Sequence, residues 1–250
     1  MLSARSIYQE IRDHDESFRL FGSIAAKGES QGGWENACIA ALCSDPELAP
    51  KIARHGRDEE KHGRLFLALL KKRELAPAEV PSDADYCMLL ERRGIGLPHV
   101  RLRERRPLAD EELLAYLAHS RVTEQRAAEE VRQQLAIFGD DPELGKTVRM
   151  IAEDEDNHLA YCHEELLRFV ERGHGREVAA MLRRYAQAEI RTYRDVSLAV
   201  MARMGAILGW PAWKQRTLAL GIHALYWIER LGTWRRMTTL RPPSRTDALG

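Results

Sequence analysis

One pattern occurs twice in this chain and limits its possible folds more than any other feature. The turn sequence Asp-Pro-Glu-Leu is found at residues 45–48 and again at residues 141–144. A Glu-x-x-His pair follows each copy at the same distance: Glu59 with His62, and Glu155 with His158. Residues three apart share one face of a helix, so each pair can hold a metal ion from one side. The equal register therefore predicts two helices that face each other across a shared metal centre.

A third Glu-x-x-His pair, Glu171 with His174, lacks the preceding turn. A chain of this length and composition is expected to contain such a pair by chance. Gly173 also interrupts the pair at the end of a predicted helix. We interpret this third copy as coincidence.

Apolar residues recur every three or four positions along nearly the whole chain, a spacing typical of amphipathic helices. Alanine, leucine, arginine and glutamate are abundant, and all four favour helix formation. We predict an all-α protein, with helices over 17–42, 46–72, 110–138, 142–172, 176–208 and 210–239. Residues 74–107 hold four of the ten prolines and are expected to form a crossover with one short helix.

Two helical pairs joined by one long crossover make a four-helix bundle of the ferritin type. This bundle would cover residues 17–172, with two additional C-terminal helices over 176–239. We expect a single domain over residues 1–240, followed by a flexible tail over 241–250. Asp110 is expected to cap the third helix of the bundle.

The two partner helices of such a bundle each contribute one glutamate to the metal site. In an antiparallel pair, a ligand before the turn must lie about as far from it as the ligand after it. Glu29 meets this condition, 14 residues before Cys43, where the first turn begins. Glu124 meets it in the second half, at the same distance from Phe138. Glu35 lies only eight residues before Cys43 and is expected on another face.

An aspartate precedes each Glu-x-x-His pair, Asp58 in the first copy and Asp154 in the second. A metal-bound imidazole usually donates its second N–H to a carboxylate. We expect Asp58 to serve His158 in this way, across the bundle. Asp154 would serve His62. The alternative is that both are solvated acids on faces that are acidic already.

Four carboxylates and two imidazoles form an oxygen-rich set that suits iron or manganese. Zinc would normally take a single tetrahedral site richer in nitrogen and sulfur. Two iron ions are the expected cofactor, with manganese as the alternative. The predicted ligands are Glu29, Glu59, His62, Glu124, Glu155 and His158.

With these residues assembled, the chain resembles the ferritin-like diiron-carboxylate superfamily. Gly-Glu-Ser-Gln at 28–31 resembles the first-helix ligand motif of rubrerythrins, and 58–66 resembles their second-helix motif. The order of the motifs, and the segment 158–165, resemble the aldehyde-deformylating oxygenases of cyanobacteria. The resemblance implies a ferritin-like bundle that activates O₂ at two iron ions.

The chain also departs from both groups. Rubrerythrins have a further glutamate where this chain has Ala127, and their rubredoxin-like part needs CxxC pairs, which are absent here. The aldehyde-processing relatives have a strongly apolar channel. Here the third helix carries five polar residues: Arg121, Gln125, Arg126, Glu129 and Glu130. A long alkyl substrate is therefore not expected.

The first hypothesis is a diiron oxygenase that uses O₂ to oxidise a small organic substrate by hydroxylation, N-oxygenation or C–C cleavage, with an external electron donor such as a reductase or ferredoxin. Small residues at 32–33 and 127–128 leave room beside two ligands, unless they serve helix packing. Tyr161 is a candidate redox or hydrogen-bonding residue, or a plain core tyrosine. The alternatives are a ferroxidase or peroxidase of the rubrerythrin type, and a helical module without metal.

The composition excludes several other classes. Basic and acidic side chains are balanced at 38 each, which argues against a nucleic-acid-binding protein. No apolar run reaches the ~18 residues of a membrane span, and the N-terminal segment has no apolar signal core. The four cysteines form no CxxC pair and indicate no disulfide framework. A cytoplasmic protein is expected, and a homodimer is left open.

Two further groups of residues have alternative interpretations. Six arginines of the crossover are interpreted as a solvated loop, with an anionic substrate, a carrier protein or a tRNA as the alternative: Arg92, Arg93, Arg101, Arg103, Arg105 and Arg106. Four tryptophans are expected to pack over the bundle or to line a pocket mouth: Trp210, Trp213, Trp227 and Trp234.

Overall fold

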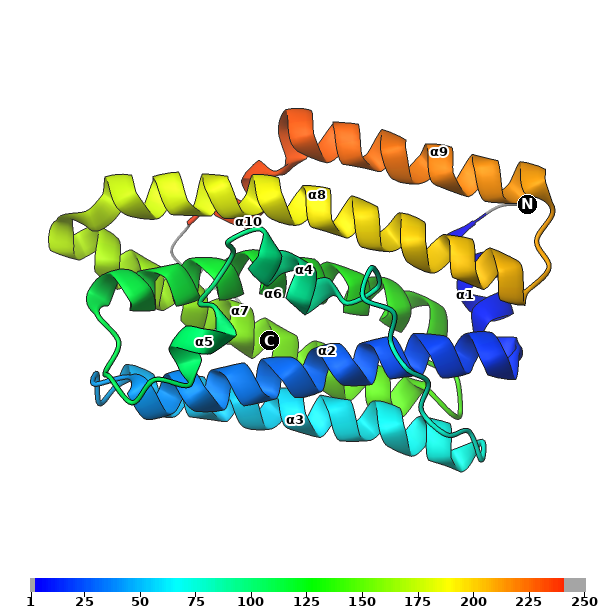
Figure 1. Cartoon of the computed structure of the whole chain (residues 1–250), viewed down its shortest axis with the longest axis horizontal. Helices are drawn as coiled ribbons and strands as arrows, with labels where there is room; N and C mark the ends of the chain where they lie inside the picture. The colour runs from blue at the N-terminus through cyan, green and yellow to red at the C-terminus, as the bar shows by residue number, and fades with distance from the viewer. Residues whose placement is uncertain (1–2, 241–250) are drawn as a thin grey trace.

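The computed structural model describes residues 3–240, and the chain is all-helical within this range (Figure 1). Its helices are α1 (Ala4–Asp13), α2 (Asp15–Leu42), α3 (Leu48–Lys72), α4 (Tyr86–Arg92), α5 (His99–Leu102), α6 (Asp110–Phe138), α7 (Gly145–Phe169), α8 (Gly175–Ile207), α9 (Ala212–Ile228) and α10 (Arg235–Thr238). Helix α2 pairs with α3 and α6 pairs with α7. The all-α class and the long antiparallel helix packing confirm that part of the prediction. The predicted tail at 241–250 lies outside the described residues.

Helix α1 departs from the prediction, which starts the first helix at residue 17. The Ser3 side chain caps α1, and Ile7 and Ile11 are its buried residues. Both belong to a small apolar cluster that also contains Trp210, from the far end of the chain. A ten-residue helix is marginal on its own. Packing against distant residues therefore stabilises α1, and such packing leaves little trace in a local pattern.

The two Asp-Pro-Glu-Leu copies fold into the same turn. Asp45 Oδ1 accepts hydrogen bonds from the backbone N–H groups of Glu47 and Leu48, at 2.8 and 3.1 Å. In the second copy, Asp141 Oδ1 accepts the equivalent bonds from residues 143 and 144, at 2.8 and 2.9 Å. These turns lead into α3 and α7, so the helices that carry the Glu-x-x-His pairs start in closely similar ways.

Helix α6 begins at Asp110 as predicted, but its capping residue is Ala109 and not Asp110. Glu112 Oε2 accepts the backbone N–H of Ala109 at 2.8 Å. The same carboxylate binds the guanidinium of Arg101 in α5, and this pair ties the crossover to the start of α6. The crossover contains two short helices, α4 and α5, where the sequence predicts one.

The chain reverses between α7 and α8 through a π-helical turn, Val170–His174. Gly173 adopts a φ of 98° there, a left-handed conformation that glycine takes without steric cost. Gly209 has a φ of 62° and ends α8 in the same way. The predicted breaks at both glycine positions are therefore explained by backbone geometry.

Helix α8 runs lengthwise along one side of the bundle and packs against α6 and α4 (Figure 1). A buried ion-pair cluster joins these layers. Arg126 of α6 contacts Glu189 of α8 at 2.9 Å and Glu229, just beyond α9, at 2.8 Å. The main apolar core lies around this contact and includes Leu117 and Tyr185.

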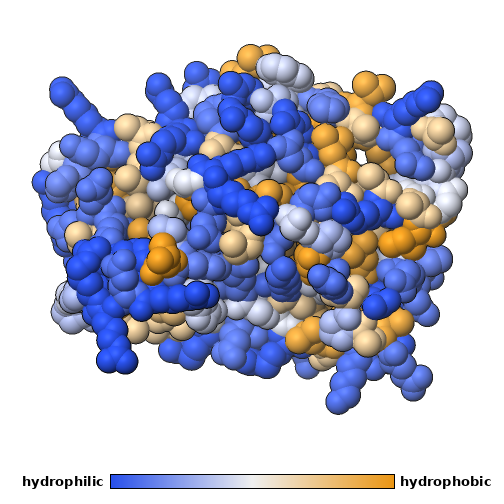
Figure 2. All heavy atoms as spheres, viewed as in Figure 1, coloured by the Kyte–Doolittle hydropathy of each residue, from blue (hydrophilic) through white to orange (hydrophobic). Residues whose placement is uncertain are grey.

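Helix α9 is less covered than the rest. The exposed fractions of Trp213, Leu220 and Trp227 are 62%, 69% and 54%. Figure 2 shows apolar residues along the upper edge of the molecule, where α9 lies in Figure 1. Trp210 is buried and Trp234 is partly buried against the core. The expectation that the tryptophans pack over the bundle is therefore correct for only two of the four.

No helix among the described residues is both long and apolar enough to cross a membrane. All four cysteines carry free thiols: Cys38, Cys43, Cys87 and Cys162.

Candidate metal centre

Two adjacent groups of side chains form the candidate metal centre, and in each the possible ligand atoms lie within 4.8 Å of one another. The first group consists of Glu29, Glu59, His62 and Glu155. The second consists of His55, Glu59, Glu124 and His158. The structure thus brings together all six residues predicted from the sequence and adds His55. Glu59 belongs to both groups, so the two groups share one carboxylate.

His62 turns one nitrogen toward the first group and the other toward Asp154. Its Nδ1 lies 3.2 Å from Glu29 Oε2 and 3.9 Å from Glu155 Oε1. Its Nε2 lies 3.0 Å from Asp154 Oδ2. Burial raises the pKa of Asp154, but Lys61 and His62 lower it below its usual value. An ionised carboxylate only accepts hydrogen bonds, so the neutral His62 ring carries its proton on Nε2 and leaves Nδ1 for a metal ion.

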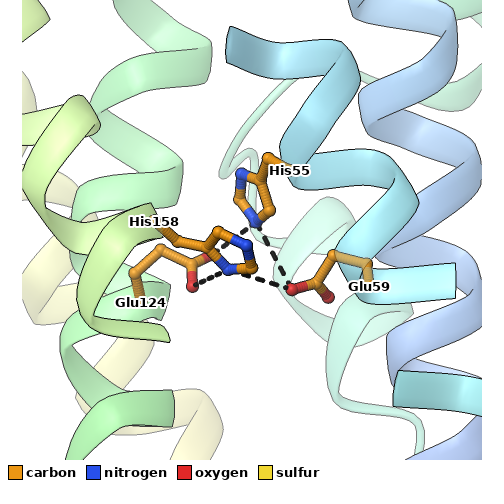
Figure 3. A group of neighbouring side chains, drawn as sticks. All are labelled: His55, Glu59, Glu124 and His158. Carbon is orange, nitrogen blue, oxygen red and sulfur yellow. Dashed lines mark ion pairs between the residues drawn. The ribbon is translucent and has the colours of Figure 1, made fainter. Parts of the chain in front are cut away.

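His158 is arranged in a similar way in the second group (Figure 3). Its Nδ1 lies 3.5 Å from Glu59 Oε1 and 3.6 Å from Glu124 Oε2. Its Nε2 lies 3.5 Å from Asp58 Oδ2, longer than a typical hydrogen bond. Each aspartate thus lies beside the imidazole that the sequence assigns to it.

His55 is the residue of this centre that the sequence analysis missed. Its Nε2 lies 3.3 Å from Glu124 Oε1 and 3.4 Å from Glu59 Oε1 (Figure 3). It precedes Glu59 by four residues and so shares its helical face. The equivalent position in the second copy of the repeat is Ile151, which is buried. A position-by-position comparison of the two copies would have revealed this difference.

A chain of buried hydrogen bonds orients His55. Its Nδ1 lies 2.7 Å from the Tyr161 hydroxyl, which lies 2.6 Å from the Tyr116 hydroxyl. Tyr116 donates to Asn36 Oδ1 at 2.7 Å. Each hydroxyl has one proton, so Tyr116 accepts from Tyr161, and Tyr161 accepts from His55 Nδ1. The neutral His55 ring therefore offers Nε2 to the centre, and Tyr161 is a hydrogen-bonding residue behind it.

Two carboxylates of the centre have raised pKa values, whereas burial of Glu124 is outweighed by His55 and His158, which lower its pKa well below its usual value. Burial, together with nearby Glu59, raises the pKa of Glu29 to about 8. Burial and the charges of Glu124 and Glu59 raise the pKa of Glu155 well above its usual value. Crowded, buried carboxylates favour the protonated form unless cations balance them. Two divalent ions would provide that balance.

In the metal-free protein, protonated imidazoles supply part of the positive charge. Burial lowers the pKa of His55, but Glu124 and Glu59 outweigh this effect and raise it to about 10. Burial also opposes protonation of His62, and Glu29 and Asp154 raise its pKa to about 9. Metal binding must therefore displace protons from these rings.

The residues present fit a pair of metal ions. Four buried atoms of the centre make no hydrogen bond with any described residue: His55 Nε2, both ring nitrogens of His158, and Glu155 Oε2. Buried polar atoms nearly always have a partner. Imidazole nitrogen and carboxylate oxygen are ligands that iron and manganese accept. Metal ions held by the two groups would give His55 Nε2, His158 Nδ1 and Glu155 Oε2 the partners that they lack.

A cavity of about 360 Å³ opens beside the centre, and its wall includes His55 and the four glutamates of the two groups. Gly32 lines it, and a Cβ at that position would lie 2.9 Å from Glu59 Oε2. Gly33 serves helix packing instead, because a Cβ there would lie 3.0 Å from backbone atoms of α3. On α6, Ala127 lines the cavity and Ala128 is buried in the interior.

Five polar residues of α6 served as evidence against an apolar substrate, and most of them do not line the cavity. Arg121 binds backbone carbonyls near α10, and Gln125 binds Arg121 and Glu129. Among the five polar residues named from the sequence, only Arg126 and Glu130 line the cavity. The sequence-based objection to a long alkyl substrate therefore loses most of its support.

Other candidates from the sequence lie outside the centre. Glu35 accepts a hydrogen bond from His99 Nε2 at 2.8 Å and belongs to neither group. Glu171 and His174 are exposed at the turn after α7, as expected for a coincidental match.

Three of the six crossover arginines, Arg93, Arg101 and Arg106, form ion pairs with acids among residues 3–240. Arg93 contacts Asp195 at 2.5 Å, and Arg101 contacts Glu112 at 2.5 Å. None of the six arginines lines the cavity in the described part of the chain. Arg101 is buried in its ion pair, whereas Arg92, Arg103, Arg105 and Arg106 are exposed, so the solvated interpretation holds for these four.

Comparison of the chain with protein-family models, with curated proteins and with solved structures finds no match. The molecule is thus defined by its own architecture and site. It is an all-helical protein with two adjacent, largely buried carboxylate–histidine groups that resemble a dimetal site.

Proposed function

We propose that this protein is a dinuclear iron oxygenase that oxidises a small organic substrate with O₂. The observation that carries the proposal is that two adjacent carboxylate–histidine groups open onto one cavity. A site that only stores or oxidises metal needs no such space, whereas ligand pockets typically measure ~300–1,000 Å³. Manganese is the alternative metal.

Within this proposal, Glu59 would help to hold both ions, Glu29 the ion of the first group and Glu124 that of the second. Iron bound there would supply the redox chemistry that O₂ activation requires. The small residues Gly32 and Ala127 leave space between the ligands and the substrate.

The outer partners of the imidazoles would hold the ligands in place. Asp154 accepts from His62, and Tyr161 accepts from His55. Such partners fix the ring orientation and raise the basicity of the ligand nitrogen. These hydrogen bonds are already formed in the structure. Metal binding would therefore require little rearrangement of the ligand side chains.

A hydroxylation of this kind has a defined electron balance. One oxygen atom of O₂ enters a substrate C–H bond, and the other leaves as water. Two electrons and two protons must come from outside the substrate, so an external donor such as a ferredoxin or reductase is part of the proposal. N-oxygenation and C–C cleavage are the other outcomes that such a site supports.

Oxygen consumption tests the proposal. The iron-loaded protein is reduced without air, mixed with O₂, and compared with a Glu59→Ala/Glu155→Ala variant. We expect rapid O₂ uptake by the wild type and by a His174→Ala control, and none by the double variant. Many Fe²⁺ ions oxidised per protein without an organic substrate would favour the ferroxidase alternative. No O₂ uptake by the loaded, reduced protein would exclude the oxygenase.

A further inference from the structure

The cavity beside the centre is elongated. Along α2 its wall runs over residues 24–39, and along α6 over residues 116–130. Each stretch corresponds to roughly 20 Å at ~1.5 Å per residue. A volume of about 360 Å³ spread over this length makes a narrow passage. Glu29 and Glu124 lie within the two stretches, so the cavity extends to both sides of the centre.

The basic side chains of this wall are already paired. Lys27 Nζ lies 2.7 Å from Asp85, and Arg126 lies between Glu189 and Glu229. Among the described residues, these are the lysine and arginine side chains that line the cavity. Neither is free to neutralise the carboxylate or phosphate of a substrate.

The acidic side chains of the wall outside the centre also have partners. Glu35 accepts from His99 Nε2, and Glu130 accepts from the hydroxyl groups of Tyr8 and Tyr193. Glu91 Oε1 accepts the backbone N–H of His99 at 3.0 Å, and Glu91 Oε2, which makes no hydrogen bond with a described residue, lies 3.7 Å from His99 Nδ1. A cationic substrate would have to compete with these donors. Burying a charge without a partner is strongly unfavourable. The wall therefore suits an uncharged substrate.

His119 differs from these residues. It lines the cavity from α6, and its ring makes no hydrogen bond or ion pair with any described residue. Burial lowers the pKa of His119, so the ring is neutral at neutral pH and offers one donor and one acceptor. Gly96, with a φ of 75°, makes room for the ring, because a Cβ there would lie 2.5 Å from His119 Nδ1. The His119 side chain is partly exposed, and it forms part of the cavity wall.

We infer that His119 binds the polar end of a slender, uncharged substrate, such as an alcohol, a ketone or an amide. The oxidation of this substrate rests on the proposed function, whereas its binding depends only on the cavity. His119 precedes Glu124 by five residues, or roughly 7–8 Å along the helix axis. The anchored end therefore lies away from the metal centre, and oxidation falls several bonds from the polar group.

Binding of three eight-carbon probes tests the inference: 1-octanol, octanoate and octylammonium. Dissociation constants are measured by calorimetry on the purified protein, with metal content determined in the same sample. We expect 1-octanol to bind at least about tenfold more tightly than either ion. His119→Phe should weaken 1-octanol binding roughly three- to tenfold and leave octanoate unchanged. His119→Gln keeps a donor and an acceptor and should retain most of the affinity.

His223→Phe is the matched control, because His223 is exposed on α9 and lies outside the cavity. Octanoate or octylammonium binding as tightly as 1-octanol would overturn the inference. So would a folded His119→Phe variant with unchanged 1-octanol affinity. If His119→Phe does not fold, two measurements still test the inference: the order of affinities of the three probes for the wild type, and the 1-octanol affinity of His119→Gln. If the protein binds no metal even after incubation with iron but still shows the expected ranking, the proposed function fails and this inference stands.

The position of the bound alcohol can be measured as well. With Mn²⁺ in the centre, paramagnetic broadening of the 1-octanol NMR signals should be stronger for the methyl half than for the hydroxymethyl group. Stronger broadening at the hydroxymethyl group would place the polar end at the metal and overturn anchoring at His119.

Discussion

The imidazole rings of His55 and His158 stack across the bundle, with ring centroids 3.9 Å apart and planes inclined by 29°. Each directs one nitrogen toward Glu59 and Glu124. The second group therefore offers two imidazole nitrogens, whereas the first offers only that of His62. Two ions held there would differ in their nitrogen ligands, which makes the two halves of the centre chemically inequivalent.

We expect His55→Ala to weaken one of the two metal positions and leave the other intact. Bound metal should fall from about two equivalents toward one when free metal is limiting, because the second group loses one of its two nitrogens. Tyr161→Phe should keep both ions but weaken binding at this position roughly 10–100-fold, since His55 loses its outer partner. Elemental analysis measures the number of bound ions, and chelator competition measures their affinity. Unchanged binding by His55→Ala would mean that this ring has only a structural role.

Removing one glutamate from each Glu-x-x-His pair should abolish metal binding. The Glu59→Ala/Glu155→Ala variant loses the carboxylate shared by both groups and the glutamate of the second pair. We expect less than roughly a tenth of an equivalent of metal after expression in iron-replete medium. The matched control is Glu171→Ala/His174→Ala, which alters the third, exposed pair. Equal metal content in the wild type and both variants would argue for a helical module without metal.

Metal affinity should rise with pH. In the metal-free protein the pKa of Glu29 is about 8 and that of His62 is about 9, both above their usual values. Protons occupy these ligands below those pKa values and compete with the metal. Because the pKa of His55 is about 10, affinity is expected to increase from pH 6 to about pH 10 and to level off above it. Competition with a chelator of known pH dependence measures this, and a flat profile would contradict it.

Three glycines of α2 should respond differently to alanine. Gly33→Ala places a Cβ 3.0 Å from the backbone of α3 and is expected to destabilise the fold by ~1–3 kcal/mol. Gly28→Ala meets nothing within 4 Å and should stabilise the helix by up to ~1 kcal/mol. Gly32→Ala crowds only the end of the Glu59 side chain, so metal binding should suffer more than stability. Urea denaturation and metal titration separate these effects, and equal stability of all three variants would contradict the packing role of Gly33.

Acid stability should depend on the Glu112–Arg101 pair. Arg101 lowers the pKa of Glu112 to about 2. A lowered pKa contributes stability above the unfolded value of ~4.3 that is lost as the pH falls through the folded value. Glu112→Gln should cost on the order of 1 kcal/mol at pH 7, and its stability should decline less between about pH 5 and pH 2. Glu111→Gln, at the exposed neighbouring position, is the control, and identical pH profiles for all three proteins would exclude this contribution.

Local patterns in the sequence account for much of this molecule. The repeated Asp-Pro-Glu-Leu turn fixes where α3 and α7 begin, because a single aspartate oxygen caps the turn in each copy. Helical periodicity then places Glu59 and Glu155 at matching heights. The same counting places Glu29 and Glu124 opposite them, and the structure brings all four together.

The tertiary structure decided what counting along one helix cannot reach. His55 faces the centre only because α7 brings His158 against it, and its orientation depends on hydroxyl groups of α6 and α7. Helix α1 is stabilised by contacts with residues about 200 positions away. The cavity and the unpartnered ring of His119 arise from the way α2, α4, α6 and α8 meet. A ligand set spaced along helices can be read from the sequence because periodicity is local, whereas a cavity is set by long-range packing, which no short pattern encodes.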